Sequence, residues 1–167
     1  MWLPFDLHPE YPPEGLPRER LLARYGPAVT DRMRSFFASR GLDYNPNPDI
    51  VSNSLRALRL TELARDLGRH PEVHDRLMHA YWSEGRDIGD VEVLRRLAEE
   101  LQLPGDALDE VLTGERYRDR VEGSTRRAVT IGANAVPAFL LDRRLLVLGA
   151  QPEELFEQAF ARLGEAQ

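Results

Sequence analysis

The chemistry open to this chain is limited first by a residue type that it lacks. None of its 167 residues is cysteine, so the chain supplies no disulfide, no thiolate metal ligand and no cysteine nucleophile. The patterns GxGxxG, GxxxxGKS/T and GxSxG, which accompany dinucleotide binding, phosphate binding and serine hydrolysis, do not occur. Ser52, Ser54 and Ser124 have no histidine near them in the sequence. We therefore predict capping or surface roles for these serines and no catalytic residue in this chain.

Three histidines lie close together in and beside PEVHDRLMHAYW, namely His70, His74 and His79. His70 and His74 are four residues apart, a spacing that can place two imidazoles on one metal ion. Pro71 lies between them, however, so His70 is expected to precede the helix, and no HExxH pattern occurs. We predict no metal site here and assign these histidines to exposed or capping positions.

Composition and charge are those of an ordinary globular protein. Apolar residues make up 42% of the chain and charged residues 30%. The 28 acidic and 22 basic residues are scattered and give a net charge of −6, which argues against a nucleic-acid partner. No stretch reaches the roughly 20 apolar residues of a membrane span, and MWLPFDLHPEYP lacks the regions of a signal peptide. We expect a cytoplasmic protein with no membrane partner.

Hydrophobic periodicity and turn residues divide the chain into a strand, a long helical region, a hairpin and a final helix. Residues 2–7, WLPFDL, have the character of a short strand, although Pro4 restricts it to an edge or to an outward-facing nitrogen. Residues 18–132 follow a helical pattern broken by prolines and glycines. VPAFLLD, a turn at residues 142–144 and LLVLGA predict a hairpin, and PEELFEQAFARL predicts an amphipathic helix. Helices inserted between strands imply an α/β sheet with a helical subdomain.

Caps and apolar stripes locate individual helices within the helical region. Two helices are expected between residues 18 and 41, the second opening with Pro27. Asp90 is expected to cap a later helix. Ser52 or Asn53 is expected to cap a further helix with a stripe of leucines for the core, Leu55, Leu58, Leu63 and Leu67.

The proline of ANAVPAFLL stands where it would normally end sheet pairing. A Val136–Pro137 bond can be cis, because the trans form of an X-Pro bond is favoured by only about 0.5–1 kcal/mol. It can equally be a trans bond at the start of an edge strand. The local sequence leaves both alternatives open.

Several motifs together resemble the DsbA-like branch of the thioredoxin superfamily. AVPAFLLDRRLLVLGAQPEELFEQAF resembles the C-terminal strand, hairpin and helix of that branch, and PFDLHPEYPPEG its second strand and following loop. SNSLRALRL and AYWSEGRDIGD resemble the helical insertion, especially that of FrnE-like proteins, 2-hydroxychromene-2-carboxylate isomerases and kappa-class glutathione transferases. The resemblance spans nearly the whole chain. It implies a thioredoxin-like sheet with a large all-helical insertion, with residues 1–17 and 132–167 in an incomplete thioredoxin-like domain and 18–131 in the insertion.

The resemblance also implies a binding site. In this family the proline corresponding to Pro137 is cis, and the backbone of the residue before it, here Val136, pairs with a substrate peptide or glutathione as an added strand. Ala135 belongs to the same loop. An asparagine at the place of Asn53 reaches the thiol ligand in the isomerases and transferases, whereas simple helix capping is the alternative for Asn53. Gln151, in LGAQP, lies where backbone amides at a helix start could seat a ligand carboxylate.

The family's first strand, with its Cys-x-x-Cys or Ser motif, and its first helix have no counterpart in this sequence. Because that strand lies inside the sheet, the strands at 2–7 and 138–141 would each lose a partner. Three explanations are open: the sequence begins after that unit, the sheet of a degenerate relative has rearranged, or another protomer supplies a strand. We expect unpaired edges near residues 2–7 to favour a homo-oligomer.

Two hypotheses about function follow. The first is a thiol-disulfide oxidoreductase or glutathione-dependent isomerase family member that is inactive as this chain, because the catalytic cysteine is missing. The second is a non-catalytic thioredoxin-fold module that binds a peptide or a small thiol. No cofactor is expected, and glutathione is the candidate ligand.

Overall fold

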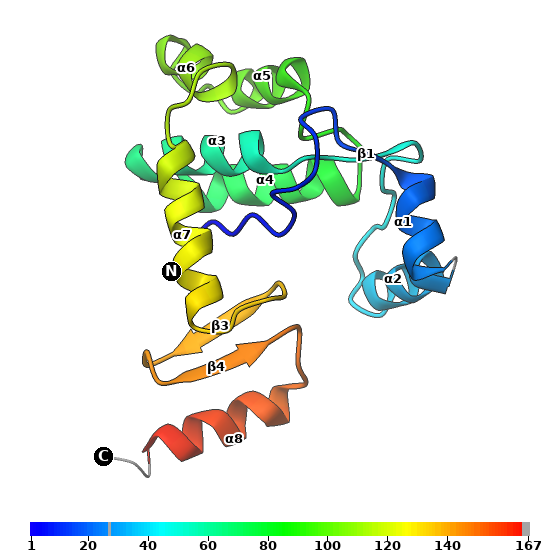
Figure 1. The fold of residues 1–167 in the computed structure, drawn as a ribbon, viewed down its shortest axis with the longest axis vertical. Helices are drawn as coiled ribbons and strands as arrows, with labels where there is room; N and C mark the ends of the chain where they lie inside the picture. Colours follow the sequence, from blue (N-terminus) through cyan, green and yellow to red (C-terminus); the bar gives the residue numbers. More distant parts are fainter. Residues whose placement is uncertain (27, 165–167) are drawn as a thin grey trace.

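The computed structural model describes residues 1–26 and 28–164. Figure 1 shows a helical body at one end of the molecule, a hairpin with the C-terminal helix at the other end, and one helix, α7, running between them. The helical body consists of α3 (Leu55–Asp66), α4 (His70–Trp82), α5 (Val91–Glu100), η1 (Gly105–Ala107) and α6 (Leu108–Leu112). Helix α7 spans Arg118–Thr130. Two further helices, α1 (Arg18–Tyr25) and α2 (Ala28–Ala38), lie to one side of this body.

Helix α3 is the centre of the hydrophobic core. Its buried apolar residues are Ala57, Leu60, Leu63 and Ala64, and they pack with apolar residues of α4, α5 and α6 in one cluster. The expected leucine stripe is correct only in part: Leu63 is buried, Leu55 and Leu58 are half-buried, and Leu67 is 41% exposed at the C-cap, past the end of the helix. Since neighbours cover α3 on several sides, burial extends beyond one stripe.

Charged residues on α3 are also buried, and each is paired. Glu62 accepts a hydrogen bond from Arg65 Nε at 3.0 Å and another from Arg120 Nη1, on α7, at 3.4 Å. Arg59 donates to the backbone carbonyls of Glu110 at 3.0 Å and Arg116 at 2.8 Å. These contacts offset the cost of burying the charges and fasten α3 to α6 and α7.

The helix starts show which caps the sequence identified. Asp90 is the N-cap of α5 as predicted, and its Oδ1 accepts from Val93 N at 2.9 Å. The N-cap position of α3 is Ser54, without a side-chain bond, whereas the neighbouring Asn53 Oδ1 accepts from Leu55 N at 3.0 Å. Neither Ser52 nor Asn53 therefore occupies the cap position itself. Pro27, expected to open α2, lies outside the described residues.

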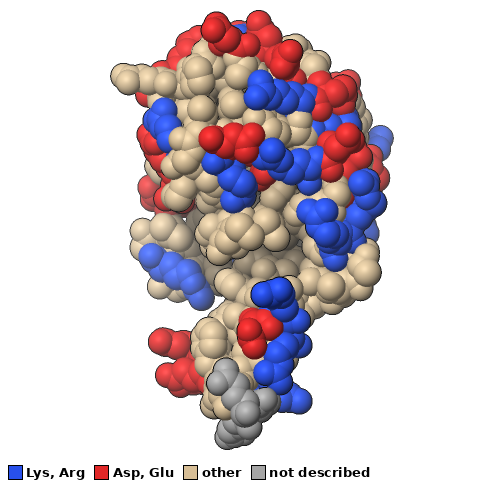
Figure 2. All heavy atoms as spheres, turned by 90° about the vertical axis from the view of Figure 1, so that its left-hand side faces the viewer, with Lys and Arg blue, Asp and Glu red and all other residues tan. Residues whose placement is uncertain are grey.

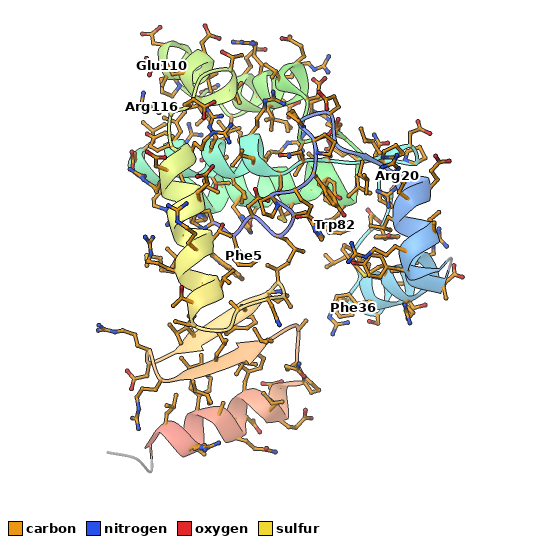
Figure 3. The ribbon with its side chains drawn as sticks, in the orientation of Figure 1. Phe5, Arg20, Phe36, Trp82, Glu110 and Arg116 are labelled. Carbon is orange, nitrogen blue, oxygen red and sulfur yellow. The ribbon has the colours of Figure 1, made fainter. Side chains whose placement is uncertain are left out.

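An aromatic cluster and a small strand pair attach α1 and α2 to the body. The ring of Trp82, at the end of α4, lies 5.3 Å from that of Phe37 and 6.0 Å from that of Tyr44, and Figure 3 shows Trp82 on the side of the body toward α2. β1 (Leu16–Pro17) pairs antiparallel with β2 (Ile50–Val51). This two-residue pairing was not predicted, since it is too short to leave a periodic pattern.

The predicted hairpin and final helix are confirmed. β3 (Ala138–Leu141) pairs antiparallel with β4 (Leu145–Leu148), and α8 (Glu153–Gly164) follows. Asp142 and Arg143, in the predicted turn, have φ angles of 48° and 55°, the left-handed geometry that suits a tight hairpin. Phe139 packs on Phe156 of α8 with ring centroids 5.0 Å apart.

The strand predicted at residues 2–7 is wrong, because these residues form no strand. A strand requires a neighbour to accept its backbone hydrogen bonds, and the two sheets of the described chain are the pairs β1–β2 and β3–β4. The segment is held instead by a bond from Arg65 Nη2 to Trp2 O at 2.7 Å and one from Asp6 N to Thr125 Oγ1 at 2.9 Å. It passes between the helical body and β3 (Figure 1).

Among the described residues, no helix is both long enough and apolar enough to cross a membrane. The division into residues 1–17 with 132–167 and residues 18–131 stays a prediction.

The position of α3 predicts where stability is concentrated. We expect Leu60→Ala, at a side chain that is 0% exposed, to lower the free energy of unfolding by about 2–5 kcal/mol through lost burial and a cavity. Leu67→Ala, at the exposed C-cap that follows the same helix, is the control and should change it by less than about 0.5 kcal/mol. Urea unfolding of both variants measures the difference, and equal losses would contradict this account of the core.

Candidate functional site

The Val136–Pro137 loop joins α7 to β3, and its peptide bond is cis. Gly132, at a φ of 92°, follows α7 and turns the chain away from the helix axis. Ala133 is buried, Ala135 and Pro137 are half-buried, and the Val136 side chain is 50% exposed. The loop thus places an exposed residue immediately before a strand.

The hairpin register determines where the backbone groups of this loop point. Gly149 N donates to Pro137 O at 2.7 Å, so the hydrogen-bonded pairs of the hairpin are 137 with 149 and, by alternation, 139 with 147. The backbone groups of residues 136, 138 and 140 therefore point away from β4. Among the described residues, the amide and carbonyl of Val136 have no hydrogen-bond partner. They form the start of an open strand edge.

Gln151 lies in the loop between β4 and α8, and its side chain forms a hydrogen bond within that loop region. Its Nε2 donates to Leu148 O at 2.7 Å, and its backbone amide donates to Gly149 O at 3.1 Å. Gly149 in turn contacts Pro137, so Gln151 and the Val136–Pro137 loop belong to one group of residues. Its amide side chain remains exposed beside that loop.

Asn53 belongs to a different group, at the start of α3. Its Nδ2 donates to Tyr11 O at 2.8 Å and its Oδ1 accepts from Leu55 N. Both ends of the side-chain amide thus hold the loop at residues 8–11 against the helix. No hydrogen bond between described residues links Asn53 to Val136. Its role toward a ligand stays a prediction.

Asp6 is a candidate that the sequence did not reveal. It is only 6% exposed and Pro4 is also buried, whereas Trp2 is exposed. A charged residue in a short apolar segment such as WLPFDL is ordinarily exposed, so the sequence provides no signal for its burial. Burial raises the pKa of the Asp6 carboxyl, an effect partly offset by hydrogen bonds from the His8 backbone and the Ser54 hydroxyl. A buried carboxyl with a raised pKa is a candidate proton-transfer or ligand group.

The surroundings of Asp6 are polar. Thr125 accepts from its amide, and Ser124 is buried on the same helix. The buried Oγ of Ser52 has no hydrogen-bond partner among the described residues. The two hydroxyl residues that contact Asp6, Thr125 on α7 and Ser54 at the start of α3, join the N-terminal segment to both helices.

Two of the three histidines stack on each other. Helix α4 begins at His70, which corrects the expectation that His70 precedes it, so His70 and His74 share one helix. Their rings are stacked with centroids 5.7 Å apart, and Trp2 stacks on His74 at 5.8 Å. Burial, and then the charge of Arg65, lower the pKa of His70. No group of three metal-ligating side chains was found in the described part of the chain.

Trp2 connects the helical body to the hairpin. Besides stacking on His74, its ring lies 6.4 Å from that of Phe139 in β3. The indole is 55% exposed, so an occupant of the β3 edge would lie close to it. This contact joins residues far apart in the chain and leaves no signal in the local sequence.

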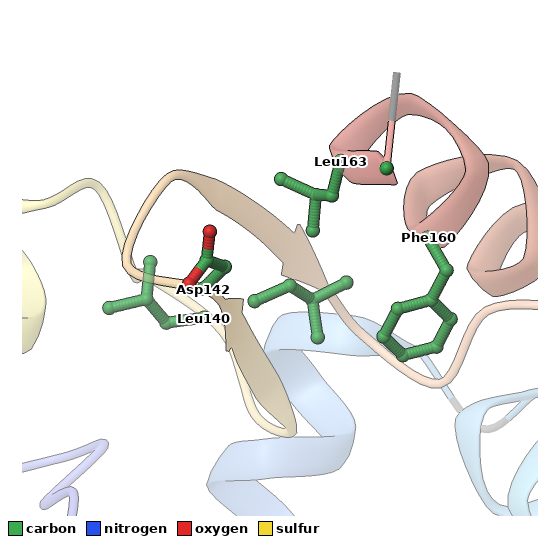
Figure 4. A pocket seen from close by; sticks show the side chains of 6 residues that line it. Leu140, Asp142, Phe160 and Leu163 are labelled. Carbon is green, nitrogen blue, oxygen red and sulfur yellow. The ribbon is translucent and has the colours of Figure 1, made fainter. Parts of the chain in front are cut away.

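Two apolar grooves lie on the hairpin and α8. The first, of about 370 Å³, is lined by Leu140, Asp142, Phe160 and Leu163 among others (Figure 4). The second, of about 540 Å³, runs along β4. Their linings are mainly aliphatic and suit apolar contact rather than proton transfer.

Comparison with known proteins identifies the family. The model of the DSBA-like thioredoxin domain matches residues 1–161, so the chain belongs to the family of DSBA-like thioredoxin domain proteins. This confirms the resemblance and the mixed α/β fold, which is mostly helical with small sheets. The absence of cysteine means that the chain carries no Cys-x-x-Cys motif.

Individual relatives agree with this assignment. A crystal structure of a probable DsbA oxidoreductase from Streptomyces coelicolor is similar with a TM-score of 0.85 and 31% identity, covering 98% of this chain and 74% of that one. The uncharacterized protein YwbO of Bacillus subtilis is 25% identical over 162 residues, 96% of this chain and 80% of its own. The cytosolic disulfide reductase DsbM from Pseudomonas aeruginosa, solved with GSH, has a TM-score of 0.51 and 27% identity over 70% of this chain and 62% of that one.

The raised pKa of Asp6 predicts a pH-dependent cost to stability. Because the folded state raises this pKa, the protonated carboxyl is favoured in the fold, and the associated stability is present below the ordinary pKa and lost as the pH rises through the raised one. Asp6→Asn should therefore be more stable than the parent chain at neutral pH, with an advantage that shrinks toward pH 4. Urea unfolding across this range tests it. A parent chain that gains stability relative to Asp6→Asn with rising pH would contradict the raised pKa.

Proposed function

We propose that this chain is a non-catalytic thioredoxin-fold binding module that holds an extended peptide or a small thiol such as glutathione along the β3 edge. The observation that carries the proposal is the outward-facing amide and carbonyl of Val136, which have no partner among the described residues. A ligand backbone can pair with these groups as an added strand. Ala138 and Leu140 continue the same edge for a longer peptide.

The hydrogen bonds alone would give weak binding. Each contributes about 0.5–1.5 kcal/mol net, so two bonds to Val136 require additional contacts for a useful affinity. Trp2 and Phe139 lie next to the edge and offer apolar and aromatic surface for a ligand side chain. The Pseudomonas aeruginosa reductase, whose structure contains GSH, supports a thiol as the ligand class. Its cytosolic description likewise supports a cytoplasmic location for this chain.

We also propose that these 167 residues alone do not catalyse thiol–disulfide exchange. The family relationship points toward an oxidoreductase, yet exchange needs a thiolate to attack the disulfide sulfur, and this chain has no cysteine. A thiol from the ligand itself could occupy the site without turnover. The alternative, an enzyme whose thiol comes from a further segment, would require a cysteine outside these residues.

An insulin-reduction assay tests the catalytic part. With dithiothreitol as reductant, we expect the chain to leave the rate of insulin precipitation at the uncatalysed background, because there is no thiolate to relay electrons. The parallel control is thioredoxin under the same conditions. Turnover above background by the 167-residue chain would refute the inactive assignment.

Titration with reduced glutathione, followed by tryptophan fluorescence, tests the binding part. We expect saturable quenching that disappears in Trp2→Phe and persists in Trp82→Phe, since Trp2 lies beside β3 and Trp82 lies near α2. Val136→Ala keeps both backbone groups and should keep the affinity, whereas Val136→Pro removes the amide donor and should weaken it about tenfold or more.

Because the Val136→Pro variant could fail to fold, the site is also tested on the unsubstituted chain. In a ¹H–¹⁵N correlation spectrum, glutathione should shift the Val136 amide and its neighbours in β3. Saturable binding that leaves the Val136 amide unshifted would place the ligand elsewhere and overturn the proposed site.

A further inference from the structure

The outer edge of β4 pairs with no other described strand, and its side chains carry no charge. Residues 145 and 147 direct their backbone groups toward β3, so those of Leu146 and Leu148 point outward by alternation. β4 pairs only with β3 among the described strands. Its four residues are Leu, Leu, Val and Leu, without the lysine, proline or inward-pointing charge by which edge strands usually avoid pairing.

A groove follows this edge. Its volume is about 540 Å³, and it lies between β4 and one side of α8. Val147 and Ala159 are buried at the contact of strand and helix, while Leu155 of α8 remains 39% exposed. The edge therefore combines the outward-facing amide and carbonyl of Leu146 and the amide of Leu148 with uncovered aliphatic surface, whereas the Leu148 carbonyl accepts a hydrogen bond from Gln151 Nε2 at 2.7 Å.

Charges are segregated along this hairpin and helix. Helix α8 runs back along the hairpin from the end of β4 toward the turn (Figure 1). The turn end thus carries Arg143, Arg144 and Arg162, against which Asp142, 3.8 Å from Arg144, leaves a net positive charge. Glu153 and Glu154 in the first turn of α8 occupy the other end. Figure 2 looks onto the turn end, where basic side chains follow one side of the lower part of the molecule and acidic side chains lie beside them.

We propose that a second copy of this chain occupies the β4 edge, its β4 running antiparallel to the first across a two-fold axis. The charge pattern favours this occupant, because an antiparallel arrangement places the basic end of each copy against the acidic end of the other. A parallel arrangement would place like charges together. The result is a four-stranded sheet in the order β3–β4–β4–β3, with both α8 helices on one face and Leu155 covered. The two-fold contact is isologous and closes as a dimer.

This edge differs from the one expected from the sequence. Residues 2–7, the segment expected to self-associate, form no strand, whereas β4 is a strand with an open edge. The dimer does not depend on the proposed ligand site, because that site uses the opposite edge of the hairpin, along β3. Both edges can be occupied together.

The dimer is expected to be weak, because a four-residue edge and one helix side form a small interface. Interfaces below about 1,200 Å² belong to transient complexes. Sedimentation equilibrium between roughly 10 µM and 1 mM, a range that covers weak dissociation constants, should show a monomer–dimer equilibrium. A chain that stays monomeric throughout overturns the proposal.

A matched pair of lysine substitutions locates the contact. Leu146→Lys should raise the dissociation constant about tenfold or more, because lysine on an edge strand opposes pairing. Leu140→Lys places the same residue at the cross-strand partner of Leu146, on the β3 side, and should leave the dimer unchanged. Equal effects of the two substitutions would overturn the assignment to β4. Thermal melting checks that both variants are folded.

Charge reversal tests the antiparallel direction without altering the strand. Arg162→Glu and Glu154→Arg should each weaken the dimer severalfold, and the double variant should recover most of the loss, because it restores opposite charges across the axis. Additive weakening in the double variant would overturn the antiparallel arrangement. The glutathione titration should be unchanged in these variants, so that failure of the dimer and failure of the ligand site are distinguishable.

Discussion

The amide and carbonyl groups of a strand must find hydrogen-bond partners, and this requirement dominates the structure. β3 and β4 satisfy each other along one edge and leave the opposite edges open. A two-stranded hairpin is marginal by itself, so its stability depends on α8, on Trp2 and on whatever pairs with the open edges. The edge of β3 begins at Val136 and provides the proposed ligand site. The edge of β4 is purely aliphatic and provides the proposed contact between copies.

The helical body is stabilised differently, by a continuous core and by paired buried charges. Leu60, Leu77, Leu94 and Leu97 are almost completely covered, and Glu62 links two arginines from α3 and α7. One of them, Arg65, also holds the Trp2 carbonyl. The N-terminal segment is consequently attached to the helical body while its indole reaches β3. Together with α7, this segment connects the helical body to the site (Figure 1).

Family membership and chemistry point in different directions for this chain. The DSBA-like domain match covers residues 1–161, yet the chemistry associated with oxidoreductases of this kind needs a thiol that these residues do not contain. What the chain retains is the scaffold around the site: the loop before β3, the exposed Val136 and an adjacent tryptophan. Asp6, with Thr125 and Ser54 as hydrogen-bond partners, forms a second polar region, in which burial raises the pKa of the Asp6 carboxyl. Groups of this kind are commonly retained for function rather than for stability.

The sequence by itself determined the local features. Proline and glycine positions and apolar periodicity located the helices, the Asp90 cap and the hairpin, because these depend on neighbouring residues. The motifs also identified the family. Only the tertiary structure decided whether residues 2–7 become a strand, which sides of α3 are buried and what Asn53 and Asp6 contact. Each of these depends on partners far away in the chain, such as Tyr11 for Asn53 and Thr125 for Asp6. A strand-like segment has the same composition whether or not a neighbouring strand is present, so strand pairing could not be predicted from the residue pattern.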